Sequence, residues 1–363
     1  MPHGRQRSPS RPATACLVAL VLLTCACGQT GAAGRSGDDG LTIAATTTVM
    51  GDVVRNVSPG TAEISVLMEP GTDPHTFEPS ARQLVELQDA DLVVANGGGL
   101  EEGLQAALDD AAAASVPVFS ALEHVTPLEV EHEDGDDHDA TGGQDARSDH
   151  DQERPSDGSG EAQGDATHDR GADEVSTPDG DGHDHGGVDP HFWMDPVRMA
   201  EAVSALGTQI GELTGAPQRS AERAQRYATE LHDLDRRIVA LFDDLPQDRR
   251  TIVTNHETLA YFADRYDLRV AGTVIPGMTT GAEPSARDIE QLAAALRREG
   301  VTTIFTDSTA PAQLATTLAR EVGAHVEIVE LHTESLGGQE GGPQSYVDML
   351  MIDAERISGA LRP

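Results

Sequence analysis

Three histidines and one glutamate are the residues of this sequence best suited, by type and position, to bind a metal ion. Three of them follow the end of a predicted β-strand: His75, His256 and Glu334. In open α/β sheets the carboxyl ends of the strands line the crevice that binds ligands. The fourth residue, His191, lies just before a predicted helix. Three imidazoles and a carboxylate form a four-coordinate set of nitrogen and oxygen donors, which suits zinc.

The surroundings of these residues are more informative than their spacing. Successive members of the set are 116, 65 and 78 residues apart, which matches no short metal-binding motif. Pro74 and Pro190 stand directly before His75 and His191 and restrict the backbone there. Both histidines are therefore expected on rigid loops, and rigid loops lower the entropy cost of assembling a binding site.

Cysteine takes no part in this chemistry. The three cysteines, Cys16, Cys25 and Cys27, all lie close to the N-terminus. The rest of the chain has neither a disulfide nor a thiolate site, so a tight transition-metal site must use histidines and carboxylates.

The N-terminus resembles a bacterial lipoprotein signal peptide, which we predict at residues 1–27. Arginines precede an apolar run at residues 15–26, and this run is too short to cross a bilayer core of about 30 Å. Small residues and then Cys27 end the run, which makes Cys27 the expected site of lipid attachment. Thr24 stands where such signals prefer leucine, so Cys25 is a second candidate and a plain cleaved signal peptide is the alternative.

Charge is spread unevenly along the 363 residues, whose formal net charge is −37. The segment 129–187 alone carries 20 acidic residues and three arginines. We expect no nucleic-acid partner, because phosphates need a basic face, whereas an acidic surface attracts cations. The segment has almost no apolar side chains, so this acidic insert is predicted to be disordered.

Histidines are frequent in the acidic insert and are expected to bind metal weakly. Six lie there: His132, His138, His150, His168, His183 and His185. Short runs such as His-Asp-His at 183–185 would raise the metal concentration near a binding cleft, so we interpret the insert as a scavenging or sensing antenna. A solvated spacer with incidental histidines is the alternative.

Outside the insert, predicted strands and helices alternate, which argues for parallel sheets covered by helices. After a flexible tether at 28–40, strands are expected at 41–45, 63–68, 91–95 and 116–120, with helices at 50–57, 80–87 and 101–114. Later in the chain, strands are expected at 251–254, 269–275, 301–306 and 325–331, with helices at 257–266, 285–299, 312–322 and 344–361.

Two further helices are predicted between these blocks, at 196–213 and 220–245. In the second, apolar residues recur at steps of three or four, which marks a long amphipathic helix that would join two lobes as a strut. The expected N-terminal lobe comprises residues 41–128 and ends with 188–219. The C-terminal lobe is expected at 246–363.

Four segments resemble the zinc- and manganese-binding solute-binding lipoproteins of ABC transporters. They are Gly-Thr-Asp-Pro-His-Thr-Phe-Glu-Pro at 71–79, Asp-Leu-Val-Val-Ala-Asn-Gly at 91–97, Asp-Pro-His-Phe-Trp-Met-Asp-Pro at 189–196 and Asn-His-Glu-Thr-Leu-Ala-Tyr-Phe-Ala at 255–263. The similarity extends from about residue 41 to the C-terminus, without the acidic insert. The two Pro-His motifs are highly specific in combination.

The resemblance implies an α/β fold of two four-stranded βα lobes, joined by one long rigid helix, with a metal site in the cleft between the lobes. It implies that His75, His191 and His256 are ligands, and three imidazoles favour Zn²⁺ over Mn²⁺. The family usually has aspartate at the fourth position, where this chain has Glu334. His332 and a water molecule are therefore alternative fourth ligands.

The resemblance also implies a function in transport rather than catalysis. The protein would bind zinc outside the cytoplasm and deliver it to a permease and its ATPase. We expect a monomer held at the cell membrane by its lipid anchor, with a soluble periplasmic or secreted protein as the alternative. A manganese-selective uptake protein and a metal-dependent adhesin are competing functions. A zinc hydrolase with Glu257 as general base is a third, although no His-Glu-x-x-His motif supports it.

Four other residues are expected to lie outside the tight metal site. Asp307 is expected to cap a helix or accept a hydrogen bond, and Trp193 to pack between the lobes. His232 is expected to be exposed on the long helix. His124 either belongs to the antenna or ends a strand.

Overall fold

The computed structural model describes residues 40–58, 60, 62–128, 188–282, 284–323, 326–337 and 342–362. The predicted signal peptide, the lipid-attachment candidates Cys25 and Cys27, nearly all of the tether and the acidic insert with its six histidines lie outside the described residues. Among the helices in the described ranges, none combines the length and apolar character needed to span a bilayer.

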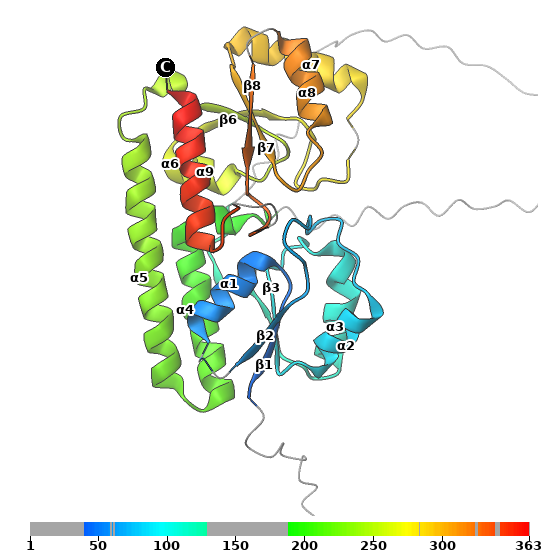
Figure 1. Ribbon diagram of the computed structural model, residues 1–363, viewed down its shortest axis with the longest axis vertical. Coiled ribbons are helices and arrows are strands. Elements are labelled where there is room, and N and C mark those ends of the chain that lie inside the picture. The colour runs from blue at the N-terminus through cyan, green and yellow to red at the C-terminus, as the bar shows by residue number, and fades with distance from the viewer. Residues whose placement is uncertain are drawn as a thin grey trace, which may run out of the picture. The chain divides into compact units, whose positions relative to one another are not determined.

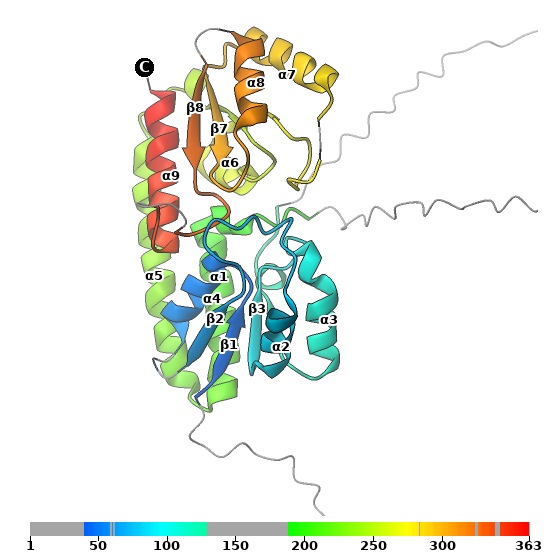
Figure 2. The same ribbon diagram turned by 45° about the vertical axis from the view of Figure 1, so that its right-hand side comes forward.

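The first lobe is built on a parallel sheet whose strand order is β2-β1-β3-β4. Its strands are β1 (Thr42–Ala45), β2 (Glu63–Val66), β3 (Leu92–Ala95) and β4 (Val118–Ser120). Helix α1 (Thr48–Val57) lies on one side of this sheet, and α2 (Ala81–Asp89) and α3 (Gln105–Ala113) lie on the other (Figures 1 and 2). Helices on both sides explain why β3 is apolar and buried throughout, and β1 after Thr42, as parallel strands covered on two faces are.

Alternating residues of β1 and β3 divide between two cores. Ile43 and Val94 pack in the cluster that contains α1, whereas Ala44 and Val93 pack with residues of α2 and α3. This division follows from the two-residue period of a strand. The sheet is thereby fixed from both sides, and the loops at its carboxyl edge start from a rigid base.

The second lobe contains β5 (Thr251–Thr254), β6 (Arg269–Thr273), β7 (Thr303–Asp307) and β8 (Glu327–Leu331). Its helices are α6 (Ala260–Tyr266), α7 (Ala286–Glu299) and α8 (Gln313–Val322). Hydrogen bonds pair β5 with β6 and β7 with β8, both in parallel, and β5 lies beside β7. The α/β fold class with parallel strands is therefore confirmed, although in this lobe the ladders form two pairs.

Three long helices flank the lobes: α4 (Pro196–Thr214), α5 (Pro217–Phe242) and α9 (Tyr346–Leu361). Helix α5, the predicted strut, contacts α1 and α4 of the first lobe and α6 and α9 on the side of the second (Figure 1). Gly207 of α4 permits a close crossing, because a Cβ atom there would lie only 2.4 Å from the Cβ of Ala224 on α5.

The C-terminal helix makes a contact that the sequence pattern did not predict. Helix α9 packs on α5 and also reaches α1, where the backbone N–H of Tyr346 donates to Oδ2 of Asp52 at 3.0 Å. An apolar face that includes Met349, Leu350 and Ile357 is thereby buried. The second lobe is thus attached to the first along α9 as well as α5.

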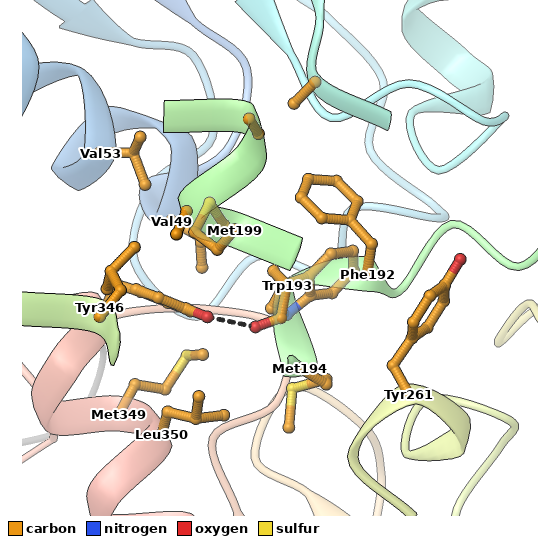
Figure 3. Packing of buried hydrophobic residues seen from close by; sticks show 14 of the residues in the cluster. Val49, Val53, Phe192, Trp193, Met194, Met199, Tyr261, Tyr346, Met349 and Leu350 are labelled. Carbon is orange, nitrogen blue, oxygen red and sulfur yellow. Dashed lines mark hydrogen bonds between the residues drawn. The ribbon is translucent and has the colours of Figure 1, made fainter. Parts of the chain in front are cut away.

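A one-turn helix at Phe192–Met194 fills the space where α1, α6 and α9 approach each other (Figure 3). The hydroxyl of Tyr346 donates to the backbone oxygen of Trp193 at 2.5 Å, and the indole Nε1–H of Trp193 donates to the backbone oxygen of Thr333 at 2.7 Å. Trp193 therefore packs between the lobes, as expected, and holds the chain that carries His191.

Candidate metal site

The structure brings the four candidate ligands together. One donor atom from each of His75, His191, His256 and Glu334 lies within 4.8 Å of the others, and all four residues are buried. The imidazole rings form a nearly regular triangle, with centroids separated by 5.3, 5.3 and 5.2 Å. Two of the residues come from the first lobe and its continuation, and two from the second lobe, so the site lies between the lobes.

Three distances between donor atoms are close to those of a four-coordinate zinc site, and the four donors all lie within 4.8 Å of one another. Nε2 of His191 lies 3.3 Å from Nε2 of His75 and 3.7 Å from Oε1 of Glu334. Nε2 of His256 lies 3.2 Å from the same glutamate oxygen. Metal–nitrogen bonds of 2.0–2.1 Å in a tetrahedron place neighbouring donors about 3.3–3.4 Å apart. A single ion fits between these atoms with little rearrangement.

Several buried polar atoms of the cluster have no hydrogen-bond partner within the described part of the chain. They include Nδ1 of His75, Nδ1 of His256 and Oε2 of Glu334. Buried polar groups in native proteins are nearly always paired. Nε2 of His256 is also without a hydrogen-bond partner, and because this atom faces the other donors, a cation in the cluster would give it one.

His191 is held by the aspartate two residues before it. Oδ1 of Asp189 accepts from the backbone N–H of His191 at 2.9 Å and lies 2.7 Å from the ring Nδ1. When Nδ1–H donates to the carboxylate, Nε2 is left as an acceptor directed at the cluster, as in many zinc sites. Burial lowers the pKa of His191, but the Asp189 carboxylate outweighs burial, so the pKa is raised above the ordinary value of 6.5.

His75 occupies the end of the loop that follows β2. Its backbone N–H donates to Oδ1 of Asp73 at 2.9 Å, in the same geometry as the Asp189–His191 pair. Burial lowers the pKa of the His75 ring to about 4. The ring is therefore neutral at physiological pH and has a lone pair for a metal.

Glu334 supplies the negative charge of the site. Its Oε1 accepts from the hydroxyl of Thr258 at 3.0 Å. Burial raises the pKa of Glu334, but the bond to His256 and the three imidazoles lower it to about 2. The side chain is thus an ionised, fully buried carboxylate, which is stable only beside positive charge.

The turn after β5 presents His256 and Thr258 to the site. The helix predicted at 257–266 begins only at Ala260, because the residues after His256 form this turn. The Thr254 hydroxyl donates to the backbone oxygen of His256 and fixes the start of the turn. Glu257 is exposed, and its side chain is not among the clustered donors.

His332, the competitor of Glu334, lies elsewhere. Its ring Nδ1 is 3.3 Å from Oγ of Ser308, and Nε2 is 3.2 Å from Nη1 of Arg356. Strand β8 ends at Leu331, so both residues lie in the loop that follows it. Of the two, Glu334 is the one that joins the three imidazoles.

The remaining predicted residues have structural contacts. Asp307 accepts from the backbone N–H of Thr309 at 2.6 Å and from the hydroxyl of Thr333, which is the acceptor role expected of it. His124 stacks on Phe119 with ring centroids 4.5 Å apart. His232 is exposed on α5, as predicted.

The supporting residues Asp73, Asp189 and Thr258 had no role in the sequence interpretation. A signal was nevertheless present, because Asp-Pro-His occurs at both 73–75 and 189–191. An aspartate two residues before a histidine can accept from its backbone N–H, which is the local pattern that aspartate favours in turns. Thr258 had no comparable signal, since its contact with Glu334 joins residues 76 positions apart.

A buried aspartate behind the site makes stability depend on pH. Both oxygens of Asp353 accept from the backbone N–H of His332, at 2.9 and 3.1 Å, and burial raises its pKa from 3.8 to about 8. Between these pH values the unfolded chain is ionised at this position while the folded protein retains the proton. The folded state therefore loses stability as pH rises through this window.

We expect Asp353→Asn to remove this loss, because asparagine keeps an oxygen that accepts from His332. At pH 8 the metal-free variant should unfold about 5 °C or more above the parent, since 1 kcal/mol corresponds to roughly 2–4 °C in a chain of this size. The difference should shrink towards pH 4. Thermal unfolding followed by circular dichroism across this range, with a chelator present, measures it, and a difference independent of pH would contradict the assignment.

Comparison with known proteins agrees with this geometry. The family model described as "Zinc-uptake complex component A periplasmic" matches residues 43–360. The chain is 24% identical to the zinc-binding protein TroA of Treponema pallidum, over 96% of this chain and 97% of that protein. It is 20% identical to the manganese-binding lipoprotein MntA of Halalkalibacterium halodurans, over 95% of this chain and 96% of that protein.

A solved structure shows the same fold. The periplasmic zinc-binding protein TroA from Treponema pallidum superimposes with a TM-score of 0.70 at 24% identity, covering 89% of this chain and all of that one. The two-lobe arrangement described above is therefore shared with a known protein fold.

Proposed function

Because the chain belongs to the family of periplasmic zinc-uptake components, whose members bind metal for ABC transporters and are not enzymes, we propose that it captures Zn²⁺ outside the cytoplasm and delivers it to an ABC permease. The observation that carries the proposal is the buried set of three imidazoles and one carboxylate between two lobes. A site between lobes can be opened by moving one lobe, so a tightly bound ion can still be released to a permease.

The donor set supports zinc over manganese. Manganese prefers six oxygen-rich ligands, whereas three imidazoles with one carboxylate suit tetrahedral zinc. The four donor residues are buried: His191 and His256 are 0% exposed, Glu334 is 3% exposed and His75 is 7% exposed. One similar protein is described as zinc-binding and another as manganese-binding, so the metal selectivity of this chain is a question for direct measurement.

The experiment is metal analysis followed by competition. Protein purified without chelator is expected to contain one tightly held zinc per chain. After stripping, calorimetry with Zn²⁺, with Mn²⁺ and with Zn²⁺ titrated into the Mn²⁺-loaded protein should show that zinc displaces manganese completely. Manganese retained against an equal concentration of zinc would support the alternative, a manganese-uptake protein.

We also propose that the acidic insert collects metal for the cleft. The described residues on either side of it lie near the site: the backbone N–H of Leu128 donates to the Tyr261 hydroxyl at 3.0 Å, and that hydroxyl donates to the backbone oxygen of Asp189 at 2.9 Å. Asp189 is the residue that holds His191. Ions bound weakly by the insert would therefore be held close to the cleft.

Deletion of residues 136–185 is expected to leave the affinity of the tight site unchanged and to lower the number of zinc ions bound per chain. A matched variant, in which only the five histidines within 136–185 become alanine, keeps the length and the acidic charge. It should lose the same weak sites if imidazoles bind the metal there. Calorimetric titration of both variants measures affinity and stoichiometry together. An unchanged stoichiometry would refute the proposal that the acidic insert binds zinc.

We propose that Cys27 carries a lipid that holds the protein at the outer face of the cell membrane, and that the protein acts as a monomer. The lipobox-like sequence ending at Cys27 supports the first point. Membrane fractionation of the parent chain and of Cys27→Ala tests it: the parent should sediment with membranes and the variant should not.

A further inference from the structure

One loop of the second lobe connects the segments that carry two of the ligands. We call residues 276–281, between β6 and α7, the strap. Where it starts, the ladder of β5 and β6 continues beyond the strand ends, since the backbone N–H of Ile275 donates to the oxygen of Asn255 at 2.7 Å. The backbone N–H of Glu257 then donates to the oxygen of Gly277 at 3.1 Å. These two bonds lie on either side of His256.

The other end of the strap is bonded to the first lobe. The hydroxyl of Thr280 donates to Oδ2 of Asp73 at 2.6 Å. Oδ1 of the same carboxylate accepts from the backbone N–H of His75 at 2.9 Å. A single aspartate therefore holds a ligand residue with one oxygen and the opposite lobe with the other.

Other hydrogen bonds between the lobes join Thr48 and Gly71 to the loop after β8, which carries Glu334. The contacts made by Asp52 and Tyr346 involve α9 and α1. In Figures 1 and 2 the loop after β6, drawn in yellow, faces the first lobe on the side away from α9. If the lobes separate about α5 and α9, the bond between Thr280 and Asp73 is one that must break.

Gly277 allows the strap to take this path. Its φ is +98°, a backbone conformation that residues with a side chain rarely adopt. The strap is thus turned at its start and reaches Asp73 within a few residues.

We propose that the strap retains the bound ion, and that the hydrogen bond from Thr280 to Asp73 controls how fast the ion leaves. This inference rests on the proposed function, since it concerns release of the same ion. Thr280 does not bind the metal; it is a positioning residue that keeps His75 and the second lobe in register. Loss of its hydroxyl is expected to speed dissociation without changing the ligands.

The test is the rate of zinc loss to a chromogenic chelator, measured by stopped flow. Thr280→Val keeps the shape of the side chain and removes the donor, and it should raise the dissociation rate about tenfold, as expected for one hydrogen bond to a charged group. Thr280→Ser restores the hydroxyl and should restore the slow rate. Thr279→Val is the matched control, because Thr279 is its exposed neighbour in the strap.

A second measurement distinguishes faster release of the ion from a disturbed metal site. The visible spectrum of the Co²⁺-loaded protein reports the ligand geometry, and it should be the same in Thr280→Val and the parent. An unchanged dissociation rate in Thr280→Val, or an equal increase in Thr279→Val, would refute the proposed role of the strap in retaining the ion. If the parent chain bound neither zinc nor cobalt, the proposed function itself would fail, so the two failures are distinguishable.

Discussion

Replacing His75 with alanine is expected to weaken zinc binding by at least about 10³-fold while both lobes remain folded. Removing an outer partner of a metal ligand already costs roughly 10–100-fold, so loss of a ligand should cost more. Folding should survive, because Nδ1 of His75 has no partner among the described residues and the ring occupies the cleft rather than a core. Asp73 would still accept from the backbone N–H of the alanine.

Calorimetric titration measures the effect, and zinc binding by other histidines must be kept out of the comparison. Five of the six histidines of the acidic insert lie within residues 136–185, so the comparison should use chains lacking that stretch and with His132 replaced by alanine. His232→Ala is the matched control, because it removes an exposed imidazole from α5 without touching the cluster. Circular dichroism should show the same helix content in the parent and both variants. An affinity unchanged by His75→Ala would remove His75 from the site and refute the four-residue centre.

Much of the fold could be predicted from local patterns. The eight predicted strands lie where apolar residues cluster between turn signals. The signal is clearest in β3, which is buried on both faces and apolar throughout, and weaker in β2, β6 and β8, which contain exposed polar residues. The candidate ligands could be recognised for a related reason: they follow strands or a proline, where side chains point to the carboxyl edge of a sheet. No long-range information was needed for either inference.

The residues that orient the ligands were harder to predict, because their contacts are long-range. Thr258 and Glu334 meet only because β5 and β8 belong to one lobe and end at the same edge. The choice between Glu334 and His332 could not be made from the strand, because β8 ends at Leu331 as predicted and both residues lie beyond it. In that loop the direction of each side chain depends on long-range contacts, which place His332 beside Ser308 and Glu334 beside His256.

The position of α9 could not be predicted from its sequence either. Its apolar face requires a partner, but periodicity does not say which one. In the structure α9 packs on α5, on β7 and β8 of its own lobe and on α1, so the start of this helix reaches the first lobe. Attachment along two helices restricts the movement of the lobes, and a restricted movement suits a site that must open by a small amount and close again.

Saturating zinc is expected to raise the midpoint of thermal unfolding by about 8–16 °C. An ion that binds only the folded state stabilises it by about 4.1 kcal/mol at a thousand times its dissociation constant, and each kcal/mol is worth roughly 2–4 °C in a chain of this size. The donors come from segments up to 259 residues apart, from His75 to Glu334, so the unfolded chain cannot present them together. Differential scanning calorimetry with and without zinc measures the shift.

The same measurement at several pH values tests how the ligands are tuned. The pKa of His75 is lowered to about 4, so this ring remains free of protons well below neutral pH. The pKa of His191 is raised above 6.5 by Asp189, so protons compete with zinc there first. A proton on Nε2 of His191 excludes the metal, and the zinc-induced shift should therefore shrink as pH falls from 7.5 to 5.5.

In Asp189→Asn the carboxylate that raises this pKa is gone, so the shift should be smaller at pH 7.5 but should decline less on acidification. A zinc-induced shift that stayed constant over this range in the parent would show that His191 does not bind the ion.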